Sequence, residues 1–243
     1  IHIVLSRTGL LDMVLSTFVL AGFGALVLDR DRTRRRLAIL GEDSPRPWPE
    51  LAAGLGPRLG LRPWRLLSIV LLALAVSVKW SALWFIAIFM LLSLLWDVST
   101  RRTVGMSRPW LATLRTSAPI VLATSLGLLA VIYVLSWTGW LLSSTGWGRN
   151  WANEQEPSII PNALRSLIDY HRQAWNFHVD LDSEHSYQSN PLSWPLMIRP
   201  TSFHYESIKD NSLGCASDHC AQEVLALGNP IIWWAALLAI PYQ

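Results

Sequence analysis

The sequence contains little charge, almost no lysine and few cysteines, and these shortages exclude several classes of protein. Charged residues make up 15% of the 243 residues and hydrophobic residues 51%, which leaves too little charge to cover a soluble protein. The net charge of +3 comes from eighteen arginines against two lysines. Because these charges lie between long apolar runs, the pattern is not that of a nucleic-acid binder. Nothing near the start resembles a basic segment followed by a cleavage site, so no signal peptide is predicted.

Long apolar runs and tryptophan dominate instead. A helix needs about 20 apolar residues to cross a bilayer, and the 14 Trp residues suit membrane–water interfaces. The run from Leu66 to Trp96 is too long for one span and short for two, so it predicts a hairpin of two short helices with its tip at Val78-Lys79-Trp80. The predicted spans cover residues 10–28, 66–78, 80–96 and 118–137. We therefore expect an all-α polytopic membrane protein.

The ends of the sequence and its arginines predict the organisation of the chain. It runs from Ile1 to Gln243, which lies inside a new apolar stretch, so we expect an internal fragment of a longer protein. Arginine is concentrated in residues 29–65 and 97–117, whereas residues 138–228 carry ten acidic residues against five basic ones. The positive-inside bias then makes the first two segments cytoplasmic and the third external. The expected domains are a transmembrane part (1–137), an external loop (138–228) and the start of a C-terminal transmembrane group (229–243).

Two charges interrupt the apolar runs at their external ends. Asp12 lies in the first span and Lys79 at the tip of the hairpin. A charge within an apolar run is costly and therefore indicates function, and a lysine is suited to bind a lipid-linked phosphate. The alternatives are a carboxylate favoured by the helix dipole for Asp12, and an amine reaching headgroup phosphates for Lys79.

The external loop contains one predicted helix. From Pro161, the apolar residues and two histidines fall on one helical face, which predicts an amphipathic helix lying on the outer membrane surface. His171, His178 and His185 do not complete a metal-site spacing, so no metal is expected.

The loop ends in a polar block and a cysteine pair. Residues 185–200 are rich in the hydroxyls, amides and aromatic rings that bind sugars and peptides, although a turn-rich loop explains the same composition. Cys215 and Cys220 are the only cysteines, and four residues separate them, which excludes a redox Cys-x-x-Cys pair. On the external, oxidising side they predict a local disulfide, with two free thiols as the alternative.

Four strings, in order along the chain, resemble the protein O-mannosyltransferases, most closely their actinobacterial members. They are Ser6-Arg7-Thr8-Gly9-Leu10-Leu11-Asp12, then Leu74-Ala75-Val76-Ser77-Val78-Lys79-Trp80-Ser81, then the block from His185 to Pro200, and finally Leu227-Gly228-Asn229-Pro230 with Trp233-Trp234. The resemblance implies a membrane glycosyltransferase of the GT-C type that moves mannose from a polyprenyl phosphate carrier to Ser or Thr hydroxyls of exported proteins. It implies the plasma membrane as the location, no cofactor, and a secretion translocon as a candidate partner.

The resemblance also implies residue roles. The catalytic carboxylate of the family lies in a first external loop, which we expect upstream of Ile1, so no catalytic residue is assigned here and the fragment is expected to be inactive alone. Lys79 would neutralise the carrier phosphate as it leaves. Arg7 and Asp12 would shape the rim of the pocket, and contacts to the sugar or acceptor, or a brace for the first loop, would come from Tyr187, Gln188, Ser189 and Arg199.

Two other functions fit parts of the pattern. A related polyprenyl-phosphate sugar transferase acting on lipid or glycan would have a similar hairpin. A transporter or non-catalytic scaffold would distribute charges through several spans and show inverted repeats, which this sequence lacks.

Overall fold

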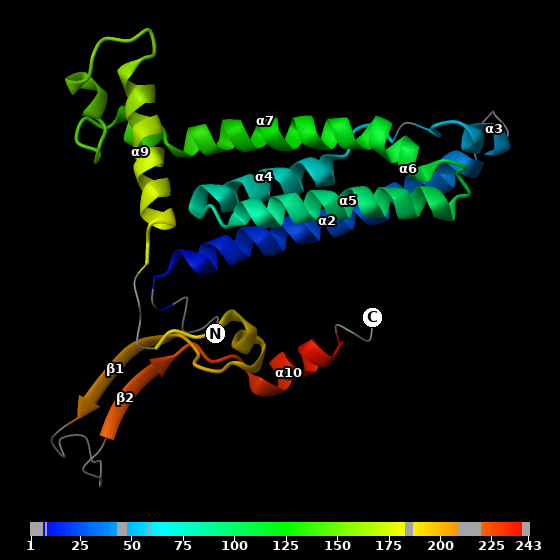
Figure 1. The fold of residues 1–243 in the computed structure, drawn as a ribbon. Coiled ribbons are helices and arrows are strands. Elements are labelled where there is room, and N and C mark those ends of the chain that lie inside the picture. Colours follow the sequence, from blue (N-terminus) through cyan, green and yellow to red (C-terminus); the bar gives the residue numbers. More distant parts are fainter. Residues whose placement is uncertain are drawn as a thin grey trace. The chain divides into compact units, whose positions relative to one another are not determined.

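The computed structural model describes Arg7 and residues 9–42, 48–57, 59–182, 187–208 and 220–239. Most of these residues are helical (Figure 1). The chain divides into two compact units, one of residues 14–163 and one that combines residues 1–13 with residues 164–243. We call them the helical bundle and the loop unit, and each is described by itself.

The bundle consists of helices that follow the apolar runs. Its elements are α2 (Leu11–Glu42, whose first residues belong to the loop unit), α3 (Trp48–Ala53), α4 (Pro63–Val78), α5 (Ala82–Thr103), α6 (Pro109–Ala112), the π-helical turn η1 (Thr113–Ser117), α7 (Ala118–Ser136), α8 (Thr138–Leu142) and the short 3₁₀ turn η2 (Trp151–Glu154). Within the described residues, three stretches are long and apolar enough to cross a membrane: Leu11–Ile39, Ala82–Thr103 and Pro109–Ser136. The protein is thus a multi-pass membrane protein, mostly helical as the sequence predicts.

Helix α4 is the most enclosed helix of the bundle. Its Ile69, Leu72 and Ala75 are fully buried and belong to a core that also includes Leu26 of α2 and Ile86 of α5. Figure 1 shows α4 between α7 and α2, with α5 alongside. Short apolar helices such as α4 gain stability from such neighbours, because burial of each large aliphatic side chain is worth roughly 1.5–3 kcal/mol.

Helix α7, in contrast, presents apolar side chains to the outside of the bundle. Ile120, Leu122 and Leu135 are each more than 60% exposed, whereas only Val121 is fully buried among the residues of this helix. In water such a surface would be unfavourable, but lipid chains or further apolar helices cover it without cost. The exposure of α7 therefore agrees with a membrane bundle.

The first helix is longer than the apolar run that begins it. We expected a span over residues 10–28, but α2 continues through the arginine cluster to Glu42. Arginine, leucine and alanine all favour helix, and nothing between Asp29 and Leu40 interrupts it. Its 32 residues correspond to about 48 Å, against about 30 Å for the hydrocarbon core. The basic end of α2 therefore projects beyond the apolar part of the bundle.

A π-helical turn joins α6 to α7. The N–H of Ala118 donates to the carbonyl of Thr113, five residues back, instead of four. Pro119 follows directly, and proline has no N–H to donate to the carbonyl of Arg115 and clashes with a carbonyl at that position. The wider turn accommodates this proline without ending the helix, so α6, η1 and α7 run on as one apolar stretch.

The loop unit contains both helix and sheet. After α9 (Asn162–Val179) come the 3₁₀ turn η3 (Pro191–Leu196), the strands β1 (Ser202–Ile208) and β2 (Cys220–Leu225), and α10 (Pro230–Ala239). The strands pair in antiparallel register, with His204 opposite Val224 and Ile208 opposite Cys220, and a bulge lies between Ser202 and His204. The predicted helical membrane fold thus carries one short hairpin in addition, where residues 202–208 alternate aromatic and polar side chains as a strand does.

Candidate functional site

Lys79 lies in the turn between α4 and α5. Helix α4 ends at Val78, and Lys79 adopts an extended conformation while its N–H donates to the carbonyl of Ala75 at 3.0 Å. Its own carbonyl accepts the N–H of Ala82 at 3.0 Å, so the tip reverses within three residues. The residue is exposed, at the end of two apolar helices. An ammonium held there can meet an anion at the membrane surface.

A series of aromatic side chains begins at the turn, with Trp80 next to Lys79. Trp80 donates its indole N–H to the hydroxyl of Tyr133 at 2.7 Å, which attaches the hairpin tip to the end of α7. The series continues from Tyr133 to Trp137 and from Trp137 to Trp140, with ring centroids 6.4 and 5.7 Å apart. Arg149 lies over Trp140 at 5.5 Å. A cation beside such rings suits a ligand that combines a phosphate with a sugar.

Arg7 and Asp12 lie in the loop unit. Arg7 is exposed, and Asp12 is half-buried in the first turn of α2, where the helix dipole favours a carboxylate. Lys79 belongs to the bundle, so the structure does not test whether these three charges form one pocket.

The polar block folds onto itself. Arg199 donates to the backbone carbonyl of Gln188 at 2.9 Å, and Trp194 donates its indole N–H to the hydroxyl of Ser189 at 3.0 Å. Trp233 of α10 donates to the carbonyl of Pro195 at 2.9 Å, which holds η3 against α10. The structure thus brings Gln188, Ser189 and Arg199 together. Ser189 and Arg199 form bonds inside the loop, and contacts of these residues to the sugar, the acceptor or the first external loop stay a prediction.

Tyr187 and the cysteine pair complete the predicted residues. Tyr187 is exposed at the start of the same block. Cys220 opens strand β2 and is disulfide-bonded. Cys215 lies outside the described residues, so the local loop between the two cysteines stays a prediction.

Helix α9 carries the predicted amphipathic pattern. Leu164, Ile168 and Trp175 share one exposed face, and the opposite side buries Ser166 and Asp169. His171 and His178 each bond through Nδ1 to the carbonyl four residues back at 2.7 Å. His185 lies outside the described residues. The exposed apolar face is what a helix on a membrane surface requires.

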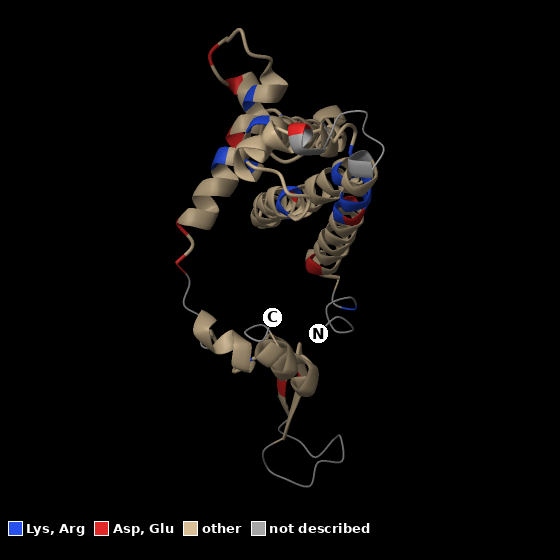
Figure 2. Ribbon diagram, turned by 90° about the vertical axis from the view of Figure 1, so that its right-hand side faces the viewer, with Lys and Arg blue, Asp and Glu red and all other residues tan. Residues whose placement is uncertain are grey.

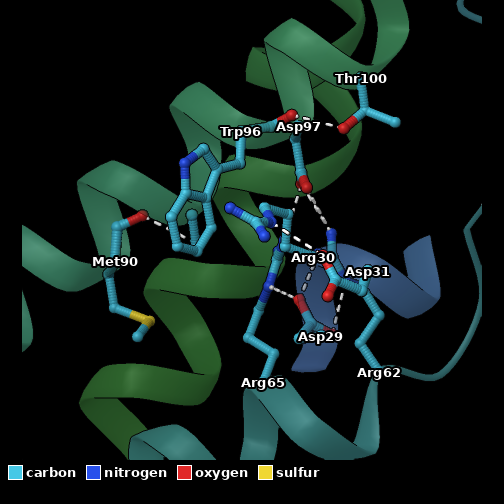
Figure 3. Close-up of polar contacts among 10 residues, drawn as sticks. Asp29, Arg30, Asp31, Arg62, Arg65, Met90, Trp96, Asp97 and Thr100 are labelled. Carbon is cyan, nitrogen blue, oxygen red and sulfur yellow. Dashed lines mark hydrogen bonds and ion pairs between the residues drawn. The ribbon is translucent and has the colours of Figure 1, made fainter. Parts of the chain in front are cut away.

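An ion cluster at the opposite end of α4 escaped the sequence analysis (Figure 3). Arg62 bonds to Asp29 and, at 2.7 and 2.8 Å, to both oxygens of Asp97, and Arg65 bonds to Asp97 at 2.8 Å. Burial opposes the charge of Arg62, but Asp97 and Asp29 outweigh it, so the pKa of this guanidinium lies above its ordinary value. Nearby, Arg30 lies over the ring of Trp96 at 5.0 Å. The cluster joins the start of α4 to the middle of α2 and to the second half of α5.

One signal in the sequence could have revealed this cluster. Asp29 ends the first apolar run and Asp97 ends the second half of the hairpin, while Arg62 and Arg65 precede its first half. All four positions lie at the predicted cytoplasmic ends of spans, where opposite charges meet when the helices pack.

Comparisons with known proteins give one family. Residues 163–242 match the model described as the C-terminal four TMM region of protein-O-mannosyltransferase. Over its full length the chain is 34% identical to the polyprenol-phosphate-mannose–protein mannosyltransferase of Mycobacterium tuberculosis H37Rv, of which it covers 47%.

More distant relatives carry related names. Over 98% of its length the chain is 32% identical to the polyprenol-phosphate-mannose–protein mannosyltransferase of Corynebacterium glutamicum, of which it covers 46%. Over 30% of its length it is 31% identical to dolichyl-phosphate-mannose–protein mannosyltransferase 1 of Saccharomyces cerevisiae, of which it covers 7%. The chain spans about half the length of the bacterial relatives it matches. No solved structure matches it.

Proposed function

Because this chain belongs to the protein O-mannosyltransferase family, we propose that its protein transfers mannose from a polyprenyl phosphate carrier to Ser and Thr hydroxyls of exported proteins. The observation that carries the proposal is similarity along the whole chain to a relative named for this donor and acceptor. The predominantly helical bundle with three membrane-spanning stretches supports it, because a polyprenyl carrier is itself a membrane lipid.

In this mechanism Lys79 binds the phosphate of the carrier. An acceptor hydroxyl attacks the sugar carbon and loses its proton to a carboxylate, while the bond from that carbon to the phosphate oxygen breaks and the lipid phosphate leaves with the extra negative charge. The ammonium of Lys79 stabilises this charge as it develops. We expect the carboxylate upstream of Ile1. Support for the role of Lys79 is its exposed place at the hairpin tip, beside Trp80 and Tyr133.

The remaining residues assist binding. Arg7 and Asp12 shape the outer rim of the donor pocket, and the block that contains Tyr187, Gln188, Ser189 and Arg199 holds the acceptor side in place. Because Arg199 and Ser189 bond within the loop, their contribution is to fix its shape. No cofactor takes part, since the lipid-linked sugar supplies both mannose and leaving group.

The proposed location is the plasma membrane. Residues 138–228 are external, with α9 on the outer surface, and residues 29–65 and 97–117 are cytoplasmic. The excess of arginine in these two segments supports this orientation. A secretion translocon is the proposed source of unfolded acceptors.

Substitution of Lys79 tests the proposal. In membranes that contain the complete protein, Lys79→Gln should lower transfer from polyprenyl phosphate mannose to an acceptor peptide about a hundredfold, because one electrostatic contact to the leaving group is lost. Lys79→Arg, which keeps the charge, should retain part of the rate. Arg108→Gln is the matched control, since it removes one exposed basic residue from the other end of the bundle.

Two results would contradict these assignments. Full activity of Lys79→Gln would show that Lys79 does not stabilise the carrier phosphate. Mannose recovered on lipid or glycan, with none on protein, would show that the acceptor is not a protein, while the proposed donor would stay the same.

A further inference from the structure

A pocket lined by arginine lies at the end of the bundle opposite Lys79. It has a volume of about 510 Å³, within the roughly 300–1,000 Å³ range of ligand sites. Its walls come from the segment before α4, the end of α5 and the π-helical turn. Four arginines line it: Arg62, Arg65, Arg101 and Arg115. Figure 2 looks at the bundle from this end, with the ribbon coloured blue at Lys and Arg.

Two of these four arginines are already neutralised. Arg62 and Arg65 share the carboxylates of Asp29 and Asp97, so two positive charges meet two negative ones. Arg101 and Arg115 come in addition. Within the described part of the chain, no ion pair is formed by either of them. The pocket therefore carries an excess of positive charge.

Arg101 makes this excess costly. Its side chain is fully buried, and its guanidinium contacts only neutral groups: the carbonyl of Leu55 and the hydroxyl of Thr116, each at 3.1 Å, and the sulfur of Met106 at 3.8 Å. Its Nε has no hydrogen-bond partner. A buried guanidinium without a counter-ion is unfavourable by several kcal/mol. Arg101 and Thr116, which bond to each other, both line the pocket. An anion in the pocket would therefore lie close to the Arg101 guanidinium and offset this cost.

A fifth arginine lies beside the pocket, in addition to the four that line it. Arg115 is exposed, and Arg36 of α2 packs against Gly60, where a Cβ atom would come within 3.0 Å of its guanidinium. Gly60 also lines the pocket. Its φ of +66° favours glycine, and the absence of a Cβ atom leaves room for Arg36. Arg36 of α2 thus lies beside a pocket that already contains arginines from α4, α5 and the π-helical turn.

The rest of the lining is apolar and lies beside the membrane-spanning surface. Leu61 and Ile120 line the pocket and are 75% and 63% exposed, and Leu66 and Pro119 complete that side. From Ile120 the exposed apolar face of α7 continues to Val131 and Leu135. A free inorganic anion gains nothing from such walls, whereas a lipid places its headgroup among the arginines and its chains along α7.

We propose that this pocket binds the phosphate headgroup of an anionic phospholipid. Under the proposed orientation the lipid belongs to the cytoplasmic leaflet, so the pocket is separate from the external donor site at Lys79. The headgroup supplies the negative charge that Arg101 and Arg115 lack, and it joins α4, α5 and α7 at the end where the ion cluster already connects α2, α4 and α5.

Lipid binding to the complete purified protein tests the proposal. Native mass spectrometry should show retention of phosphatidylglycerol over phosphatidylcholine of the same chain length. Arg115→Gln should weaken phosphatidylglycerol binding about fivefold, the effect of one basic residue near a lipid phosphate. Arg108→Gln, an exposed arginine of the same segment outside the lining, should leave it unchanged.

A second variant and a measurement with inorganic phosphate complete the experiment. Arg101→Gln should weaken binding more than Arg115→Gln, and Arg115 keeps the test open should Arg101→Gln not fold, because its exposed side chain is dispensable for packing. Inorganic phosphate should raise the melting temperature less than phosphatidylglycerol does. Equal effects of both lipids, equal effects of phosphate and lipid, or an Arg108→Gln loss matching that of Arg115→Gln would overturn the proposal. None of these readouts depends on mannose transfer.

Discussion

Trp80 donates its indole N–H to the hydroxyl of Tyr133 at 2.7 Å, and this bond connects residues 53 positions apart. It holds the residue next to Lys79 against the end of α7. Since a cation acts on a leaving group only when it is well placed, the proposed function of Lys79 depends on this tie.

Loss of the Tyr133 hydroxyl should therefore affect catalysis more than folding. One hydrogen bond contributes about 1 kcal/mol, so Tyr133→Phe should lower the melting temperature only slightly. It should raise the KM for the lipid-linked donor or lower kcat about fivefold by loosening the hairpin tip. Tyr170→Phe, a change of the same size in α9, serves as the control. Unchanged kinetics in Tyr133→Phe would show that Lys79 is held by other contacts.

Asp97 should be among the most sensitive positions for stability. It accepts hydrogen bonds from both Arg62 and Arg65 and is almost fully buried. Asp97→Ala leaves two arginines with one carboxylate, and breaking a buried pair in this way costs about 3–5 kcal/mol. Thermal unfolding in detergent should show a large loss.

Asp31→Ala is the matched control for Asp97. Its carboxylate pairs with Arg30 at 2.9 Å but is 45% exposed, and such a pair is worth about 1 kcal/mol or less. Equal losses in the two variants would mean that the buried cluster contributes no more than a surface pair.

Gly22 permits the close approach of α2 to α4. A Cβ atom at this position would lie 3.0 Å from Cγ of Leu72 and 3.5 Å from the carbonyl of Ser68. Gly22→Ala should thus destabilise the bundle by about 1–3 kcal/mol. Gly24→Ala gains the same helix propensity but meets nothing within 4 Å, so it should be neutral or stabilising. If the two variants melted together, the contact with Leu72 would be unimportant.

The disulfide prediction concerns the start of β2. Cys220 is disulfide-bonded and the chain has only one other cysteine. Cys215→Ser should consequently expose a thiol at Cys220 that reacts with maleimide without reductant, whereas the unchanged protein should react only after reduction. Reaction of the unreduced protein would show that the pair is open.

Apolar runs made the helices predictable. The turn at Lys79 follows from a run too long for one span and too short for two, and the structure ends α4 at Val78 and begins α5 at Ala82. The continuation of α2 to Glu42 could not be read from hydropathy, because helix formation there depends on the propensity of Arg and Leu, not on burial.

The polar contacts were harder to predict. Arg62 and Asp97 are 35 residues apart, and the only signal that they meet is their shared position at the cytoplasmic ends of predicted spans. The strands over 202–208 and 220–225 were missed for a related reason, since a short strand is stabilised by a partner that lies elsewhere in the sequence. Lys79 was identifiable because a lone charge between apolar runs is conspicuous. Arg101 was not, because it is one arginine among several.

The π-helical turn makes the length of one segment a constraint in itself. Each residue of a regular helix turns the chain by about 100°. Deleting one residue from Thr113–Ser117 would restore a regular α-helix and rotate α6, with Arg115 and Thr116, by about that angle relative to α7. Thr116 would then lose Arg101, its partner at 3.1 Å. In this five-residue segment, substitutions should therefore be tolerated more readily than insertions or deletions.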